Sequence, residues 1–272
     1  MVVTREDEVL ARAAVEGLLA AVELTPKPGL PDAREADLSG LRWSARALEP
    51  GLAAMAAAAR RTGEPGKGLR GELGAVGRST ERAMARADGG AGLHHGAVWP
   101  LGLLVAGAAL APGGGVEEIT GLAGRIATHP DGRAPRVASP GSAVSVRYGA
   151  AGAKGEARAG FPHVRRASAA LRTARAAGAR EPEARLNALL TIMTTLQDTG
   201  LLHTAGPHGL REVQDGAREV LDRARKVQDG AREVLDSTLA LAAFDRRLRE
   251  RGLRPRGSGH LLAAALFLDG LR

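Results

Sequence analysis

Hydrophobic residues recur about every three or four positions along most of the chain, which is the period of an amphipathic α-helix. No series of segments alternates between hydrophobic and polar residues, as the strands of a half-buried sheet do. The spacing predicts helices over residues 5–22, 41–61, 73–87, 97–110, 116–128, 182–197, 239–251 and 260–271. We therefore expect an all-α fold: a single domain over residues 1–272, built as one multi-helix bundle with a central cleft lined by loops.

Segments rich in glycine and proline separate the predicted helices. The segment 62–71 is rich in Gly, and we expect a mobile loop there. The segment 129–145 is rich in Pro, Gly, Ser and Arg, and we expect a flexible loop or lid.

One short sequence occurs twice. VQDGAREVLD stands at 213–222 and again at 227–236. The offset is about four helical turns, so a second copy nearly keeps the buried face of a helix. The repeat is too short and too isolated for a solenoid. We therefore predict a local helical duplication over 213–236 that lengthens an exposed helix.

The composition favours closely packed helices. Hydrophobic residues make up 44% of the chain but aromatic residues only 2%, so Ala and Leu must fill the core. Ala and Leu favour helices, whereas strands favour β-branched and aromatic residues. The chain has no Cys, which excludes disulfides and thiolate metal sites.

The net charge of +8 comes almost entirely from Arg. A basic balance indicates a nucleic acid, a membrane surface or a polyphosphate substrate as partner. The Arg residues are interleaved with Asp and Glu, and no aromatic residues accompany them, which disfavours a nucleic acid. A phosphate-rich small molecule fits this pattern.

Two further observations bear on location. The amino-terminal sequence lacks the order of a signal peptide. The longest apolar run, 96–112, is too short to span a membrane and contains Pro100. We expect a cytoplasmic protein without a membrane segment, and the sequence does not indicate an oligomeric state.

The segment 89–104 reads GGAGLHHGAVWPLGLL and combines features of an anion site. Its glycines allow a ligand to approach the backbone closely, and the pair His94-His95 follows them. A buried helix then leads inward, and the N–H groups and dipole at a helix start attract an anion. A glycine-rich connection with two surface histidines is the simpler alternative.

Polar residues stand at other breaks between helices. Lys27 lies between two prolines, which forbid a helix and hold an extended turn. Glu156 lies in a glycine-rich stretch that we take as a polar loop, and Asp198 ends a predicted helix. Each residue has a purely structural alternative. Lys27 can belong to an ordinary helix stop, Glu156 to an interhelical turn, and Asp198 can cap the next segment. Because side chains at helix ends converge in bundles, we predict that these three residues and His94 line one cavity.

Five motifs occur in a specific order. They are TPKPGL at 25–30, two glycines with a histidine and a glycine at 89–96, GAKGEA at 152–157, Asp-Thr at 198–199, and Gly-Ser with LLA at 257–263. Together they resemble the triphosphoribosyl-dephospho-coenzyme A synthase family over nearly the whole chain. The resemblance implies an all-α enzyme that transfers the 5-triphosphoribosyl group of ATP to the 2′-hydroxyl of 3′-dephospho-coenzyme A and releases adenine. Its product is the precursor of the prosthetic group on the acyl-carrier subunit of citrate lyase or malonate decarboxylase.

Such a glycosyl transfer needs a proton acceptor, a proton donor and a group that stabilises positive charge on the ribose. Glu156 and Asp198 are candidates for the carboxylates, and His94 for a donor to a phosphate or to the leaving base. Asp198 is alternatively a ligand of Mg²⁺ on the triphosphate. Phosphate binding is expected from Lys27, His95, Arg147 and Lys154, and from the loop amides of Gly89, Gly90 and Gly96.

The chain departs from the family's motifs at Gly92, Leu93, His95, Gly200, Thr204 and His260. His95 stands where the family has Lys, and His260 where it has Asp. A histidine replaces the charge of a lysine only in part near neutral pH. A degenerate paralogue that binds nucleotide or a partner protein without turnover is therefore the alternative to the enzyme, and an Arg-rich nucleic-acid binder is a third possibility.

Overall fold

The chain folds into helices, and no β-strand occurs among the residues that the structure describes. The computed structural model describes residues 2–34, 37–87, 89–134, 140–226 and 231–271. The helices are α1 (Arg5–Glu23), α2 (Ser39–Arg46), α3 (Glu49–Thr62), α4 (Lys67–Ala87), α5 (His95–Leu110), α6 (Val116–Thr128), α7 (Pro140–Tyr148), α8 (Gly152–Arg158), α9 (Pro162–Ala176), α10 (Glu181–Met193), α11 (Thr199–Lys226), α12 (Ala231–Glu250) and α13 (Arg256–Asp269). The expected all-α fold is confirmed.

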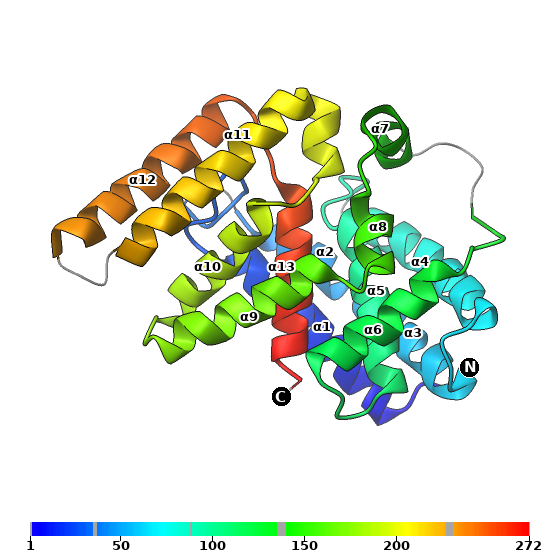
Figure 1. Cartoon of the computed structure of the whole chain (residues 1–272). Helices are drawn as coiled ribbons and strands as arrows, with labels where there is room; N and C mark the ends of the chain where they lie inside the picture. Colours follow the sequence, from blue (N-terminus) through cyan, green and yellow to red (C-terminus); the bar gives the residue numbers. More distant parts are fainter. Residues whose placement is uncertain (1, 35–36, 88, 135–139, 227–230, 272) are drawn as a thin grey trace.

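Helix α13 runs through the middle of the molecule (Figure 1). Its residues 261–268 are all buried, and it contacts α1, α5, α9, α10 and α11. A helix that is apolar on every side must be packed against other helices on every side. Helix α5 is also largely buried. No helix in the described part of the chain combines the length and the apolarity needed to cross a bilayer.

Glycines let the central helices approach closely. A Cβ atom added to Gly17 of α1 would lie 2.6 Å from the backbone nitrogen of Phe267 in α13. A Cβ added to Gly107 of α5 would lie 2.5 Å from the carbonyl oxygen of Ile119 in α6. Both distances are shorter than van der Waals contact, so small side chains set the spacing of these helices.

Two predicted boundaries differ from the structure. The predicted helix 41–61 is two helices, α2 and α3, which are joined by Ala47 and Leu48. Pro50 lies in the first turn of α3, where its missing N–H is tolerated, but it cannot continue α2. The predicted mobile loop 62–71 is shorter than expected, because α4 begins at Lys67 and buries Leu69.

The expectation of a flexible loop over 129–145 is wrong in its last part. Residues from Pro140 onward form α7, whose Val144 is buried in the core. Residues 135–139 lie outside the described residues. Before them, Asp131 accepts a hydrogen bond from the backbone N–H of Arg133, over 3.0 Å.

The glycine-rich stretch 152–157 is likewise not a loop but most of helix α8. It packs against α6, where Gly124 lies close to Gly160, just beyond the end of α8. Packing therefore overrides the low helix propensity of its glycines.

The duplicated sequence does not lengthen one helix. The first copy, 213–222, lies in α11, while the described part of the second copy lies in α12. The two helices pack against each other side by side (Figure 1). A continuous helix cannot fold back on itself, so the prediction of a single extended helix is wrong.

Replacing Gly17 by Ala tests the close approach of α1 and α13. The added methyl group meets the backbone of α13, which cannot move aside as a flexible side chain does. We expect the free energy of unfolding to fall by about 1–3 kcal/mol, the usual cost of overpacking. Urea denaturation measures the change.

Gly121→Ala is the matched control, because Gly121 lies within α6, is exposed, and has open space where the Cβ would stand. Its higher helix propensity predicts a gain of up to about 1 kcal/mol. Equal effects of the two substitutions would contradict the packing argument.

Candidate active site

Two adjoining hollows lie where several helix ends meet. The first, which we call the Lys27 hollow, has a volume of about 100 Å³ and is lined by Lys27, His94 and His260 among others. The second, the Glu156 hollow, has a volume of about 70 Å³ and is lined by Glu156, Asp198 and His260 among others. The four residues predicted to converge are all buried and come together in two pairs, with His260 lining both hollows.

Lys27 lies directly after the end of α1. Its Nζ donates hydrogen bonds to the carbonyl oxygens of Ala21 and Val22, over 3.0 and 2.8 Å. These carbonyls have no partner further along the helix, and a cation at a helix C-terminus is favourable. Burial lowers the pKa of Lys27 to about 8; Arg249 acts in the same direction, and Asp32 opposes them.

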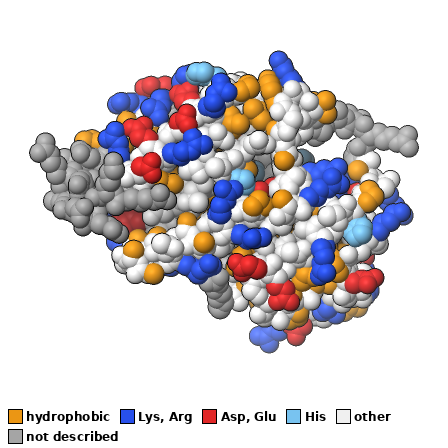
Figure 2. Space-filling model, viewed as in Figure 1, with side chains coloured by type: hydrophobic (Ala, Val, Ile, Leu, Met, Phe, Trp, Pro, Cys, Tyr) orange, Lys and Arg blue, Asp and Glu red, His pale blue; other side chains and the backbone are white. Residues whose placement is uncertain are grey.

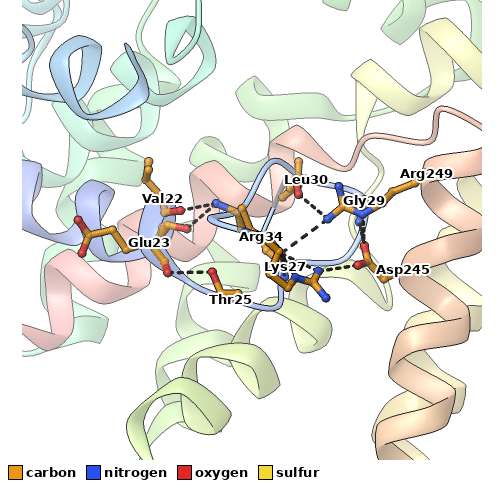
Figure 3. A network of polar contacts seen from close by, with 11 residues as sticks. Val22, Glu23, Thr25, Lys27, Gly29, Leu30, Arg34, Asp245 and Arg249 are labelled. Carbon is orange, nitrogen blue, oxygen red and sulfur yellow. Dashed lines mark hydrogen bonds and ion pairs between the residues drawn. The ribbon is translucent and has the colours of Figure 1, made fainter. Parts of the chain in front are cut away.

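A polar network holds the loop of Lys27 against α12 (Figure 3). The fully buried carboxylate of Asp32 accepts the backbone N–H of Lys27, over 3.0 Å, and pairs with Arg34. Arg34 also reaches Asp245 of α12 over 2.7 Å, and Asp245 accepts the backbone N–H of Gly29. Arg249 donates to the carbonyl oxygen of Leu30 over 3.1 Å. The position of Lys27 therefore depends on α12, far away in the sequence.

His94 stands immediately before α5 and is buried. Its Nε2 lies 2.9 Å from the carbonyl oxygen of Leu41, which only accepts, so Nε2 carries the proton. The ring of His260 lies edge-on to it, with 6.5 Å between the ring centres. Burial, reinforced by the positive charges of His94 and Arg256, lowers the pKa of His260 to about 3. His260 is therefore a neutral imidazole near pH 7.

Glu156 lies in α8 and caps the start of α9. Its Oε1 accepts the backbone N–H of His163 over 2.8 Å, and its Oε2 lies 2.6 Å from Nδ1 of the same residue. Nε2 of His163 lies 3.2 Å from the hydroxyl oxygen of Thr195. The carboxylate is thus held in one orientation. His163 is not among the residues predicted from the sequence, because nothing in its local spacing marks it.

Asp198 joins the starts of two helices. It precedes α11 and accepts the backbone N–H groups of Gly200 and Leu201, over 2.8 and 3.3 Å. It also accepts the backbone N–H of Gly257 in α13, over 2.8 Å. Burial raises the pKa of Asp198, while these N–H groups act in the opposite direction. These contacts are those of a helix cap, so the alternative that Asp198 caps the next segment is confirmed.

These contacts also bear on the expected Mg²⁺ ligand. Both carboxylate oxygens of Asp198 already accept backbone N–H groups. Among the residues described, no group of three or more His, Asp or Glu side chains is placed to hold a metal ion. Asp198 is thus engaged as a cap at the starts of two helices, and its role as a ligand of Mg²⁺ stays a prediction.

The other candidate residues lie elsewhere. Gly96 lines the Glu156 hollow, and a Cβ there would lie 2.6 Å from Nδ1 of His260. The side chain of His95 is 67% exposed, and its Nε2 lies 3.8 Å from Glu81. Arg147, Lys154, Gly89 and Gly90 are exposed and line neither hollow. The structure therefore brings five of the ten predicted site residues to the two hollows.

The surface charge is mixed. On the face shown in Figure 2, Lys and Arg side chains are interleaved with Asp and Glu. Exposed ion pairs such as Arg61 with Glu72 and Arg180 with Glu183 follow the same pattern. A nucleic-acid interface would show basic side chains gathered on one face.

Comparisons with known proteins agree over nearly the full length. The family model described as ATP:dephospho-CoA triphosphoribosyl transferase matches residues 7–272. A protein of Pseudomonas aeruginosa (strain UCBPP-PA14), named a probable 2-(5''-triphosphoribosyl)-3'-dephosphocoenzyme-A synthase, is 45% identical, over 97% of this chain and 91% of that protein. A protein of Azotobacter vinelandii with the same name is 44% identical, over 97% of this chain and 91% of its own.

No solved structure matches the chain. The matched range 7–272 nevertheless includes the motifs at 25–30, 89–96, 152–157 and 198–199, each of which contributes residues to at least one of the two hollows. The chain therefore belongs to the ATP:dephospho-CoA triphosphoribosyl transferase family, and is an enzyme of that family.

Proposed function

We propose that the protein transfers the 5-triphosphoribosyl group of ATP to the 2′-hydroxyl of 3′-dephospho-coenzyme A and releases adenine. One observation carries the proposal beyond the family match: a hollow with two buried carboxylates adjoins a hollow with a buried lysine, across one histidine. The expected alternative, a paralogue without turnover, gains no support from the relatives, which are named as synthases.

The reaction breaks the bond between the ribose and adenine and forms a bond to the acceptor oxygen. Positive charge develops on the ribose, the acceptor hydroxyl loses a proton and adenine gains one. We assign Glu156 to the proton of the acceptor hydroxyl, because His163 and the start of α9 hold its carboxylate in place. Asp198, with both oxygens bonded to backbone N–H groups, contributes its negative charge near the developing cation.

We assign the triphosphate to the Lys27 hollow. An ammonium group has three N–H donors, and the carbonyls of Ala21 and Val22 use two of them. The remaining donor, the side chain of Arg256 and His94 at the start of α5 line the same hollow. Any Mg²⁺ in the reaction arrives on the phosphates of ATP, which is how Mg²⁺ commonly binds in nucleotide sites.

The hollows are small for whole substrates. Pockets for ligands of this size usually have about 300–1,000 Å³, whereas these have about 100 and 70 Å³. ATP must therefore span both hollows, with the ribose beside His260, and the pocket must widen on binding. We further propose that the product serves the acyl-carrier subunit of malonate decarboxylase or citrate lyase.

Incubation of the purified protein with ATP, Mg²⁺ and dephospho-coenzyme A tests the proposal, with chromatography of released adenine as the readout. We expect adenine to appear only when both substrates are present, in equal amounts with the triphosphoribosyl product. Saturable binding of ATP without adenine release would contradict the proposed transfer.

Glu156→Gln tests the assigned carboxylate. The amide oxygen can still accept the backbone N–H of His163, so the fold should persist, but the amide cannot take up a proton. We expect kcat for adenine release to fall by about 10²-fold or more, which is the usual contribution of a general base.

The matched control is Glu16→Gln, since Glu16 is exposed on α1. We expect it to keep full activity, and thermal unfolding should show both variants folded. Unchanged turnover in Glu156→Gln would remove Glu156 from the chemistry.

Lys27 predicts a pH dependence of ATP binding. Its pKa of about 8 means that the ammonium is present below that pH and is lost above it. The Kd of ATP should therefore rise as the pH increases from 7 to 9. Arg256, His94 and His260 line the same hollow, and Asp32 and Arg249 act on Lys27 from the network. His260, with its pKa of about 3, stays neutral over that range.

Lys27→Met should weaken ATP binding at pH 7 by about tenfold, since a charged hydrogen bond contributes about 1.5–3 kcal/mol. It should also flatten the pH dependence. Lys67→Met, at an exposed position at the start of α4, is the control. Titration calorimetry from pH 7 to 9 measures all three proteins. An unaltered pH dependence in Lys27→Met would contradict the assignment.

A further inference from the structure

A third cavity lies beside the Glu156 hollow. It has a volume of about 190 Å³, and we call it the Arg70 pocket; its polar lining comes from Arg70, Arg78, Glu81, Trp99 and Asp131. Trp99 also lines the Glu156 hollow, so the two spaces share this residue. The pocket lies between α4 and α5, and α5 also lines the Glu156 hollow.

The pocket contains buried donors without acceptors. Arg70 is only 8% exposed, and its Nε and Nη1 have no hydrogen-bond partner among the described residues. The indole Nε1 of Trp99 is buried and has no partner either. Buried polar groups are almost always hydrogen-bonded, because each one left unpaired costs about 1–3 kcal/mol. A ligand that supplies acceptors would complete this site.

The acidic residues of the pocket do not complete it. Oδ2 of Asp131 accepts a hydrogen bond from Arg78 over 2.7 Å but lies 3.6 Å from Nη1 of Arg70. Oδ1 of Asp131 accepts the backbone N–H of Arg133. Glu81 lies at the edge, 3.8 Å from His95. The single carboxylate of Asp131 thus faces two guanidinium groups, those of Arg70 and Arg78. A guanidinium group carries a positive charge in proteins, so one negative charge stands against two positive charges.

The donors are also fixed in place. The guanidinium carbon of Arg70 lies 4.5 Å from the centre of the Trp99 ring, a stacked cation–π arrangement. Arg70 therefore keeps its position without a hydrogen bond, and its free N–H groups border a space of about 190 Å³. That space is too small for a whole nucleotide but has room for a phosphate or a diphosphate.

We propose that the Arg70 pocket is an anion subsite that binds a phosphate or diphosphate group of a nucleotide substrate. The donors are Arg70 and the indole N–H of Trp99, and Arg78 adds charge while it holds Asp131. Two sources of this group follow from the proposed function, on which this identification rests. One is the diphosphate of dephospho-coenzyme A, and the other is the triphosphate of ATP, which would then lie here instead of in the Lys27 hollow. Trp99 lines both spaces, so the pocket lies next to the hollow that holds the assigned carboxylates.

Trp99 offers a direct test, because the chain has only 2 Trp and Trp43 is 63% exposed on α2. In the full-length Trp43→Phe protein, tryptophan fluorescence reports on Trp99 alone. Titration with inorganic pyrophosphate should give a saturable change in that fluorescence. Arg70→Met in the same background should weaken pyrophosphate binding by about tenfold or more, through loss of a charge-assisted contact.

Arg86→Met, at an exposed position on the same helix, is the matched control and should bind as the Trp43→Phe protein does. Thermal unfolding checks that Arg70→Met is folded, because the substitution removes the stacking on Trp99 and the ion pair with Asp131 together with two buried N–H groups that have no acceptor. If that variant does not fold, Arg70→Lys keeps the charge without the guanidinium geometry and should still weaken binding severalfold.

Separate titrations with ATP and dephospho-coenzyme A distinguish the two sources. Weaker binding of ATP alone in Arg70→Met places the triphosphate in the pocket, and weaker binding of dephospho-coenzyme A alone places its diphosphate there. Equal affinity of all three probes for Arg70→Met and its parent overturns the inference. Adenine release by the parent is measured in parallel, so a failure of the proposed transfer is seen independently of phosphate binding at Trp99.

Discussion

The carboxylate of Asp198 joins the starts of α11 and α13, and the candidate active site depends on that junction. An ionised carboxylate is costly to bury unless hydrogen bonds compensate it. Here the backbone N–H groups of Gly200, Leu201 and Gly257 do so, and the dipoles of both helices favour its charge. A Cβ on Gly257 would lie 2.8 Å from Oδ2, so glycine is required there. With α13 fixed in this way, His260 lies between the two hollows.

Positive and negative groups are separated across His260. Lys27 and Arg256 stand on one side, with Glu156 and Asp198 on the other. The low pKa of His260 makes it a neutral partition, so it neither cancels the carboxylates nor repels a cation. This division suits a substrate with a phosphate chain at one end and a developing cation at the other. The phosphates would face the positive groups, and the cation would face the carboxylates.

Helix α5 connects all three cavities. His94, just before it, lines the Lys27 hollow; Gly96 lines the Glu156 hollow; and Trp99 lines both the Glu156 hollow and the Arg70 pocket. The rest of the helix is buried against α3, α6 and α13. A buried helix thus places chemically different side chains in three cavities within its first two turns.

The sequence by itself determined the helical class, helices with continuous apolar periodicity such as α6, and the family, because these depend on local spacing and on motif order. It also marked Lys27, His94, Glu156 and Asp198 as residues at helix ends. Only the tertiary structure decided their pairing, the contact of Glu156 with His163, and the helical state of 152–157. Contacts between distant segments leave no local pattern, and packing overrides the weak helix propensity of glycine. For the same reason, the stacking of Arg70 on Trp99, with two of its buried N–H groups lacking an acceptor, appears only once α4 and α5 are placed together.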